Sequence, residues 1–297
     1  MSENILIKIP MKVKLDCVPC LARQTLRTLR IMHLDESMQE KVLREVLKVL
    51  YTIDWDTSPP CIAHHVYRRI RELTGMDDPY RNIKRKSNEK ALQIYPDAKR
   101  IIEKNSNKLL TAVKIAIAGN VMDFGALENP DIEKTLREVL EKDFAINDYD
   151  VFRKLVLESD SLLFFADNAG EIVFDKLLIE TMNEIREKPF KKITLVVKGG
   201  PIINDATVED VYHVSFKNIK GLEIRTVSNG DPNTGPERNS DIVRQWIKEH
   251  DLVIAKGQGN YEGMSEIKGL FFLLLVKCNV LASDLGVRIG DIILKYN

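Results

Sequence analysis

The sequence is poor in cysteine, and this scarcity excludes a fold held together by disulfide bonds. Only four cysteines occur among 297 residues, whereas disulfide scaffolds are short chains with many cysteines. We therefore expect the thiols to be reduced or to bind a metal. An excess of charge of one sign is also missing, because 44 Lys and Arg residues balance 44 Asp and Glu residues. This balance gives no reason to expect a nucleic acid or an anionic membrane as a partner.

Long apolar runs are absent as well. The longest run, residues 269–276, is much shorter than the about 20 residues that a membrane-spanning helix requires. The first residues have neither the apolar core nor the small-residue cleavage site of a secretory signal. We therefore expect a cytoplasmic protein without a membrane or nucleic-acid partner, and nothing in the sequence indicates its oligomeric state. Phosphate loops and dinucleotide fingerprints are not present, since Gly257-Gln258-Gly259 lacks the third glycine.

The hydrophobic periodicity divides the chain into two halves. In residues 17–156, apolar side chains recur every three or four positions, as in amphipathic helices, and no convincing strand precedes Ser161. In the second half, short apolar runs bounded by turn residues alternate with helical patterns. Strands are expected over 162–166, 193–197, 222–227, 252–255 and 280–282, and helices over 172–187, 206–211 and 240–250. Such runs are typical of strands buried on both faces of a parallel sheet.

This alternation predicts the fold class. We expect a three-layer α/β/α sandwich with a mainly parallel, Rossmann-like sheet, preceded by an N-terminal helical bundle. The expected division is a helical domain over residues 1–157 and a metal-binding catalytic α/β/α domain over residues 158–297.

Polar residues and glycines follow the predicted strands at the edge where the carboxyl ends meet. The segments are Asp167-Asn168-Ala169-Gly170-Glu171, then residues 198–205, 228–231 and 256–262. Ligands bind at this edge of an open parallel sheet. Taken alone, the first segment could be a turn with a helix cap, and Asp205 could cap the next helix. The convergence of four polar strand ends favours a site.

The residue types at these ends point to a metal and a phosphate. Asp167, Asn168 and Asp205 offer carboxylate and amide oxygens, the hard ligands that suit Mg²⁺, Mn²⁺ or a similar cation. Three lysines could balance the charge of a phosphate: Lys198, Lys256 and Lys277. Lys198 and Lys256 could equally be solvated surface charges. Metal, lysine and backbone amides together suit transfer of a phosphoryl group to water.

Six segments, taken in order, resemble the DUF89 family, whose members are also called damage-control phosphatases or the ARMT1-like family. They are DCVPCLARQ (16–24), GNVMDFG (119–125), FADNAGEIVFD (165–175), VVKGGPIINDAT (196–207), VIAKGQGNYEG (253–263) and LLLVKCNVLASDLGV (273–287). The resemblance covers nearly the whole chain, and the early Cys-x-x-Cys is similar to the prokaryotic and archaeal branch. It implies an α/β/α domain with a helical bundle, and hydrolysis of small phosphorylated metabolites with Mn²⁺, Ni²⁺, Co²⁺ or Mg²⁺.

The resemblance also assigns roles to individual residues. It implies that Asp167, Asn168 and Asp205 bind the metal, and that Asp167, Asp205 and Lys277 act in catalysis. Asp167 is expected to orient or deprotonate the attacking water, or to attack directly. Substrate contacts are expected from Asn120, Asp123, Glu171, Lys198, Lys256 and Asn260. The Arg-Thr-x-Lys pattern of the eukaryotic branch is replaced by Leu274-Leu275-Val276-Lys277, which puts that branch's preference for sugar phosphates in doubt.

The cysteines suggest a second site. Cys17 and Cys20 have metal-ligand spacing, and Cys61 with His64 and His65 could complete a tetrahedral set for a second metal or a redox centre. The alternative is a pair of helix-start thiols packed in a reduced core.

A metal-dependent phosphomonoester hydrolase is thus the leading function. A non-catalytic metal- or nucleotide-binding protein that uses the same cleft is the alternative. Carboxyl methyl transfer, attributed to the eukaryotic branch, is not expected, because no glycine-rich S-adenosylmethionine loop follows the first strand.

Overall fold

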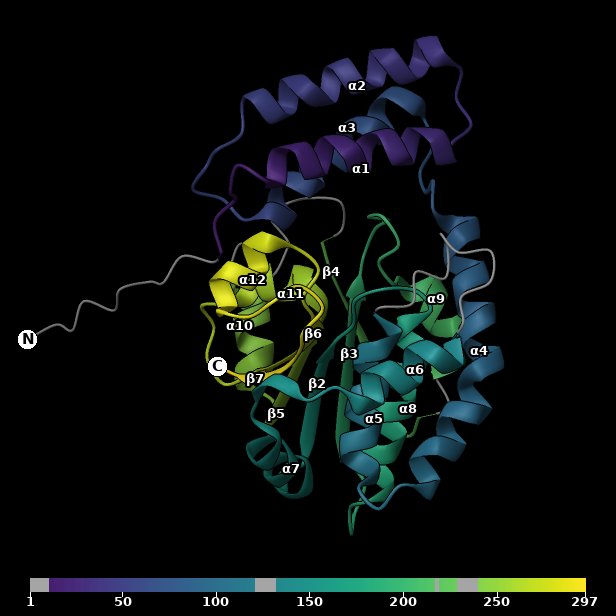
Figure 1. Cartoon of the computed structure of the whole chain (residues 1–297), viewed down its shortest axis with the longest axis vertical. Coiled ribbons are helices and arrows are strands. Elements are labelled where there is room, and N and C mark those ends of the chain that lie inside the picture. The colour runs from purple at the N-terminus through teal and green to yellow at the C-terminus, as the bar shows by residue number, and fades with distance from the viewer. Residues whose placement is uncertain (1–10, 121–131, 217–218, 229–239) are drawn as a thin grey trace, which may run out of the picture.

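The computed structural model describes residues 11–120, 132–216, 219–228 and 240–297 (Figure 1). A seven-stranded sheet in the order β1-β7-β6-β5-β2-β3-β4 lies at its centre. The strands are β1 (Phe144–Asn147), β2 (Ser161–Phe165), β3 (Lys192–Lys198), β4 (Leu222–Val227), β5 (Leu252–Lys256), β6 (Phe271–Leu275) and β7 (Ile292–Tyr296). All neighbouring strands pair in parallel except β6 and β7, which are antiparallel. The expected mainly parallel α/β fold is confirmed.

The central strand β2 explains why the sheet is buried on both faces. Successive side chains of a strand point to opposite faces, and all four residues of Leu162–Phe165 are buried. Leu162 and Phe164 pack into one core cluster, whereas Leu163 and Phe165 pack into another. Each face of the strand therefore requires its own layer of helices.

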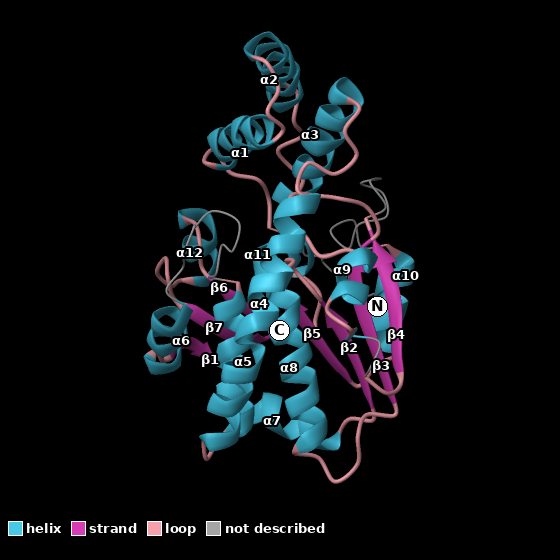
Figure 2. Ribbon diagram, turned by 90° about the vertical axis from the view of Figure 1, so that its right-hand side faces the viewer, coloured by secondary structure: helices cyan, strands magenta, loops and turns pink. Residues whose placement is uncertain are grey.

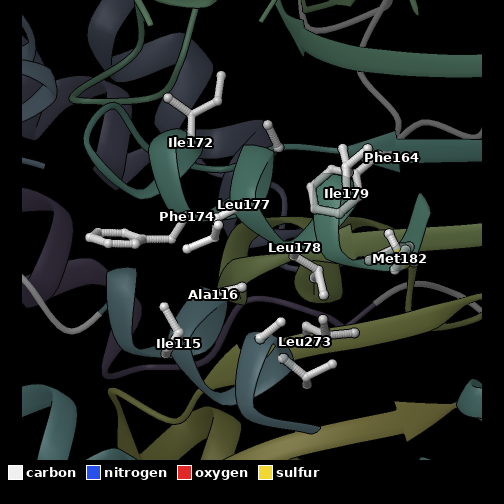
Figure 3. Close-up of a cluster of buried hydrophobic side chains, with 14 of the residues drawn as sticks. Ile115, Ala116, Phe164, Ile172, Phe174, Leu177, Leu178, Ile179, Met182 and Leu273 are labelled. Carbon is white, nitrogen blue, oxygen red and sulfur yellow. The ribbon is translucent and has the colours of Figure 1, made fainter. Parts of the chain in front are cut away.

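One face is covered by α4 (Arg81–Lys104), α5 (Lys108–Gly119) and α8 (Glu171–Glu184). The close-up in Figure 3 shows Ala116 of α5 and Phe174 and Leu178 of α8 in the cluster that also contains Phe164. The helices α6 (Ile132–Glu141), α7 (Tyr149–Glu158) and α9 (Val208–His213) contribute side chains to the same core. The other face is covered by α10 (Asp241–Lys248), α11 (Gly257–Met264) and α12 (Asn279–Leu285).

Three N-terminal helices form a separate packing unit beyond one end of the sheet (Figures 1 and 2). They are α1 (Cys17–Ile31), α2 (Glu36–Tyr51) and α3 (Pro59–Thr74), and they share an apolar core of their own. Ile202 and Ile203, from the loop between β3 and α9, pack against this core. The guanidinium of Arg71 on α3 also donates to the carbonyl of Pro201 at 2.7 Å. The N-terminal helices are thus joined to a loop that follows a strand end.

The helices α4 and α5 belong to the layer on the sheet, because they share the core of α8. The domain boundary expected between residues 157 and 158 stays a prediction. It would assign α4 and α5 to the N-terminal domain, although they pack against α8 of the second one. No helix in the described part of the chain has the length and the apolar character needed to cross a membrane.

Three expectations about the strands were wrong. A strand does precede Ser161, since β1 at the sheet edge pairs with β7. Residues 280–282 lie in α12, which begins after Cys278, whose sulfur accepts the Leu281 N–H. The adjacent strand is β6, and β7 was not expected at all. A three-residue apolar run is too short to distinguish a strand from a buried helix turn.

Candidate active site

The structure brings together the three residues expected to bind a metal. Asp167 and Asn168 follow β2, and Asp205 lies in the loop after the neighbouring β3. Asn168 and Asp205 form an antiparallel β-bridge, and the Ala206 N–H donates to the Asp167 carbonyl at 2.8 Å. These backbone bonds hold the two loops side by side, so that the three side chains share one edge of the sheet.

Helix capping does not account for these residues. The helix α8 starts after Gly170, which has a φ of 82° and provides no side-chain cap. The helix α9 is capped by Thr207 and Asp210, each of which binds the other's backbone N–H. The capping roles considered for the Asp-Asn segment and for Asp205 are therefore wrong.

Two amide groups hold Asp167 in place. The Nδ2 atoms of Asn120 and of Asn168 each donate to Asp167 Oδ2 at 2.7 Å. Burial raises the pKa of Asp167 well above its ordinary value, and the nearby carboxyls of Glu171 and Asp205 raise it further. Asp167 is therefore a carboxyl in a region that already carries several negative charges.

Glu171 is the second carboxylate that accepts from the amides of Asn120 and Asn168. Its Oε2 accepts from Asn120 Nδ2 at 2.6 Å and from Asn168 Nδ2 at 3.1 Å. Its Oε1 accepts from the ammonium of Lys256 at 2.7 Å. The Glu171 side chain has no exposed surface, so its charge is balanced inside the protein.

Lys256, expected to be a substrate contact or a solvated charge, is fully buried at the end of β5. Its Nζ donates to Glu171, to Asp175 Oδ1 at 2.5 Å and to the Ala116 carbonyl at 2.9 Å. The solvated-charge alternative is therefore wrong. Burial of Asp175 raises its pKa to about 7 despite the lysine.

A cavity of about 750 Å³ opens above these residues. Asp167, Asn168, Asp205, Lys198 and Lys277 line it from the sheet side. The N-terminal helices line it from the opposite side with Cys17, Cys20, Arg23, Arg27 and His64, among others. Asn260 also lines the cavity, although its amide donates to the carbonyls of Ala166 and Lys256. Asp123 lies outside the described residues, as do residues 229–231 of the third strand end.

Positive groups surround Asp205. The Lys198 ammonium lies 3.8 Å from Asp205 Oδ2. Burial raises the pKa of Asp205, and the charges of Lys198, His64 and Lys84 oppose this rise. Lys198, which was expected at this strand end, thus lies at the site beside the Asp205 carboxylate.

The residues present fit a divalent cation. Asp167, Asn168 and Asp205 supply oxygen donors at adjacent strand ends, and oxygen donors are the ligands of hard cations. The pKa of Asp167 is raised in part by the charge of Asp205, and a cation at this point would offset that repulsion. Among the described residues, the buried Oδ1 of Asn120 also has no hydrogen-bond partner.

The cysteines do not assemble as expected. Cys17 and Cys20 line the cavity together with Cys278, whereas Cys61 is buried and does not. In the part of the chain that the structure describes, no three side chains of His, Cys, Asp or Glu come together as a metal site. The second metal site is therefore wrong for the described residues, and a redox role stays a prediction. Burial raises the pKa of the Cys17 and Cys20 thiols, which disfavours the reactive thiolate.

Sequence reasoning missed two residues that support the site. Asn88 on α4 is fully buried, and its amide joins Gly170 N, at 2.6 Å, to Asp210 Oδ1, at 2.8 Å. Nothing in the sequence near Asn88 indicates this contact. Asp175 lies four residues after Glu171 on α8, and that spacing, which places two carboxyls on one helix face, was the available signal.

The fold and the site define an α/β protein with a cavity at the carboxyl edge of its mainly parallel sheet, lined there by carboxylates, amides and lysines. The sequence matches the family described as "Damage-control phosphatase ARMT1-like domain" over residues 13–293. The chain belongs to this family, and the resemblance drawn from its motifs is confirmed.

Relatives and a solved structure agree with this assignment. The chain is 35% identical to a damage-control phosphatase of Archaeoglobus fulgidus, over 96% of this chain and 99% of the relative. It is 32% identical to a damage-control phosphatase of Pyrococcus horikoshii, over 97% and 99%. The crystal structure of a DUF89 family protein of P. horikoshii superposes with a TM-score of 0.86 at 31% identity and covers 97% of this chain and 99% of that one. These homologues support a phosphatase function.

Proposed function

We propose that this protein is a metal-dependent phosphomonoester hydrolase that acts on small phosphorylated metabolites. The observation that carries the proposal is the meeting of Asp167, Asn168 and Asp205 at the base of a cavity that Lys198 and Lys277 also line. Oxygen donors for a cation and positive charges for an anion lie on the same wall. The damage-control phosphatases among the relatives support the same reaction class.

Asp167, Asn168 and Asp205 would hold the cation, which could be Mn²⁺, Ni²⁺, Co²⁺ or Mg²⁺. When bound, a divalent cation polarises a phosphoryl oxygen and offsets the charge that develops during transfer. Asp167 Oδ2 is engaged by the amides of Asn120 and Asn168. This leaves Oδ1 to bind the cation, to orient the attacking water and accept its proton, or to attack the phosphorus itself.

The lysines bind the anion. Lys277 is exposed at the end of β6 and lines the cavity, and Lys198 lines it at the end of β3. Their charges balance those of a phosphate, and such fixed positive charges stabilise the transition state of phosphoryl transfer. Asp205 beside Lys198 also keeps that ammonium close to the cation ligands.

The size of the cavity supports a metabolite as the substrate. Small-molecule sites have volumes of about 300–1,000 Å³, and this cavity of about 750 Å³ lies in that range. Part of its wall comes from the N-terminal helices, so a whole small molecule, and not only its phosphoryl group, would be enclosed.

The test is metal-dependent release of phosphate. The purified protein is stripped with a chelator, reloaded with each of the four cations, and assayed on p-nitrophenyl phosphate and a panel of phosphorylated metabolites. We expect activity only after reloading, and a loss of about 10²-fold or more in kcat for Asp167→Asn, as is typical when a group that acts in the transition state is removed. Asp97→Asn is the control, because this aspartate is exposed on α4 and pairs with Arg100.

The non-catalytic alternative makes the opposite prediction. A binding protein would take up the cation, with equal and negligible phosphate release from wild type and Asp167→Asn on every substrate. That result would refute the hydrolase.

A further inference from the structure

We propose that Lys256 and Asp175 are positioning residues: a buried ion pair that fixes Glu171 and, through Glu171, orients the oxygens of the metal site. The proposal rests on the proposed function and adds to it a role for two residues that do not line the cavity. Lys256 had been expected to touch the substrate, and the structure indicates a different task.

The first step is the complete use of the Lys256 ammonium inside the protein. An ammonium has three N–H donors, and three acceptors lie within 2.9 Å of Nζ, on Glu171, Asp175 and Ala116. The side chain has no exposed surface. A phosphate in the cavity therefore has no donor left to bind on this lysine.

The second step leads from Lys256 to the cavity. Lys256 binds Oε1 of Glu171, while Oε2 accepts the Nδ2 groups of Asn120 and Asn168. The same two amides donate to Asp167 Oδ2. Each amide has two N–H donors, and both are thus used between the two carboxylates.

This arrangement fixes the direction of Asn168. Because its nitrogen faces Asp167 and Glu171, its carbonyl oxygen must point away from them, and it is this oxygen that can bind a cation. A Glu171 side chain that turned away would leave the amide free to rotate. The ion pair therefore acts on the cation ligands indirectly, by holding the Glu171 carboxylate in place.

Asp175 completes the ion pair from the same helix as Glu171. It lies four residues further along α8, so both carboxyls face Lys256 on one side of the helix. Buried charges require close partners, and removal of one partner leaves the other uncompensated. The two acids and the lysine thus form a unit in which Asp175 holds the ammonium against Glu171.

The test is a double-variant cycle with Lys256→Met and Glu171→Gln. In Glu171→Gln an amide nitrogen replaces one carboxylate oxygen, so the side chain can no longer accept from Lys256 and from the Asn120 and Asn168 amides at the same time. We expect each single variant to weaken Mn²⁺ binding by about 10–100-fold, as is typical of groups that orient metal ligands. Because Lys256 acts through Glu171, the double variant should be weakened by no more than about threefold beyond the worse single variant. Losses that multiply would overturn the proposal.

Kinetics provide a second criterion. With p-nitrophenyl phosphate and saturating Mn²⁺, Lys256→Met should lower kcat by about 10–100-fold and leave KM within about threefold of wild type. A raised KM at unchanged kcat would mark Lys256 as a substrate contact and overturn the proposal. Lys176→Met is the matched control. Lys176 is likewise a largely buried lysine, but it lies on α8 and binds the Val214 carbonyl and Glu180. It should retain wild-type Mn²⁺ affinity and kinetics.

Asp175→Asn keeps the proposal testable if Lys256→Met does not fold. This variant preserves the shape of the side chain and an acceptor for Lys256 Nζ, but it removes the negative charge. The Mn²⁺ affinity should therefore fall while KM stays unchanged. An unaltered Mn²⁺ affinity would overturn the proposal. If wild type binds Mn²⁺ and the cycle is non-additive, yet no phosphate ester is hydrolysed, the proposed function fails and this inference stands. If wild type binds no Mn²⁺, both fail.

Discussion

Gly257 provides a sharp test of the site's geometry, because no side chain fits at this position. It lies at the first residue of α11, directly after Lys256, with a φ of +78°. A Cβ built on it would lie 1.9 Å from Asp167 Oδ2 and 2.3 Å from Asp167 Cγ. The carboxylate cannot swing away at little cost, because two amides hold that same oxygen. Gly257→Ala must therefore displace the carboxylate.

The size of the effect follows from two costs. A non-glycine residue in the left-handed region costs about 1–2 kcal/mol. Forcing extra volume into a packed site costs about 1–3 kcal/mol more. We expect the free energy of unfolding of Gly257→Ala to fall by about 2–5 kcal/mol. A displacement of the carboxylate by about 1 Å should lower kcat by about 10²-fold.

The control Gly269→Ala separates the cost of backbone strain from the cost of steric overlap with Asp167. Gly269 has a φ of +84°, but a Cβ there would meet nothing within 4 Å. It should lose only the about 1–2 kcal/mol of backbone strain and keep the wild-type kcat. The assays are urea unfolding of the metal-free proteins and release of phosphate from p-nitrophenyl phosphate with saturating Mn²⁺. If Gly257→Ala matches Gly269→Ala in both, the carboxylate of Asp167 is not confined as described, and the reasoning is refuted.

Two further predictions concern buried polar groups near the cavity. Burial raises the pKa of Glu262 from 4.5 to about 7. Between these pH values the folded state therefore binds more protons than the unfolded state. The free energy of unfolding should fall by about 3 kcal/mol as the pH rises through this window. Glu262→Gln should remove this part of the pH dependence in urea unfolding at pH 5 and pH 8; an identical change in both proteins would contradict the assignment. Asn88→Ala should destabilise the protein by about 3 kcal/mol, because the N–H of Gly170 and the carboxylate of Asp210 lose a buried partner. Unfolding in urea measures this, and a loss below about 0.5 kcal/mol, the usual effect of a surface substitution, would show that the two loops do not depend on Asn88.

The location of the site could be predicted from the sequence, because it follows from a general property of parallel sheets. The run of residues 162–166 indicated a buried strand, and the polar residues after it had to lie at the carboxyl edge. The same reasoning applied to residues 193–197 and placed Asp205 beside Asp167, which the bridge between Asn168 and Asp205 confirms. Strand order was not needed for this step, because β2 and β3 are consecutive in the chain and adjacent in the sheet.

The direction of each side chain could not be predicted in this way. Lys256 and Lys198 both end a buried strand and precede a glycine, yet one is fully buried and the other lines the cavity. The difference arises from α5 and α8, which place a carbonyl and two carboxylates around Lys256. Asn88 was missed for a related reason, since its partner Gly170 is 82 positions away. β1 was missed because its four residues alternate between half-buried and exposed at the sheet edge.

The pairing of β1 has a consequence for the order in which the chain folds. β1 lies at the edge of the sheet, and its neighbour there is β7. After β1, the ribosome must therefore synthesise β2 to β6, and then residues 292–296, before that edge can form. Contacts so distant in sequence are slow to close, and an unpaired strand is exposed to association with other chains in the meantime. Completion of the sheet at β1 is thus expected to be a late event in folding, even though β2 and β3, which carry the three oxygen donors, are consecutive and can pair earlier.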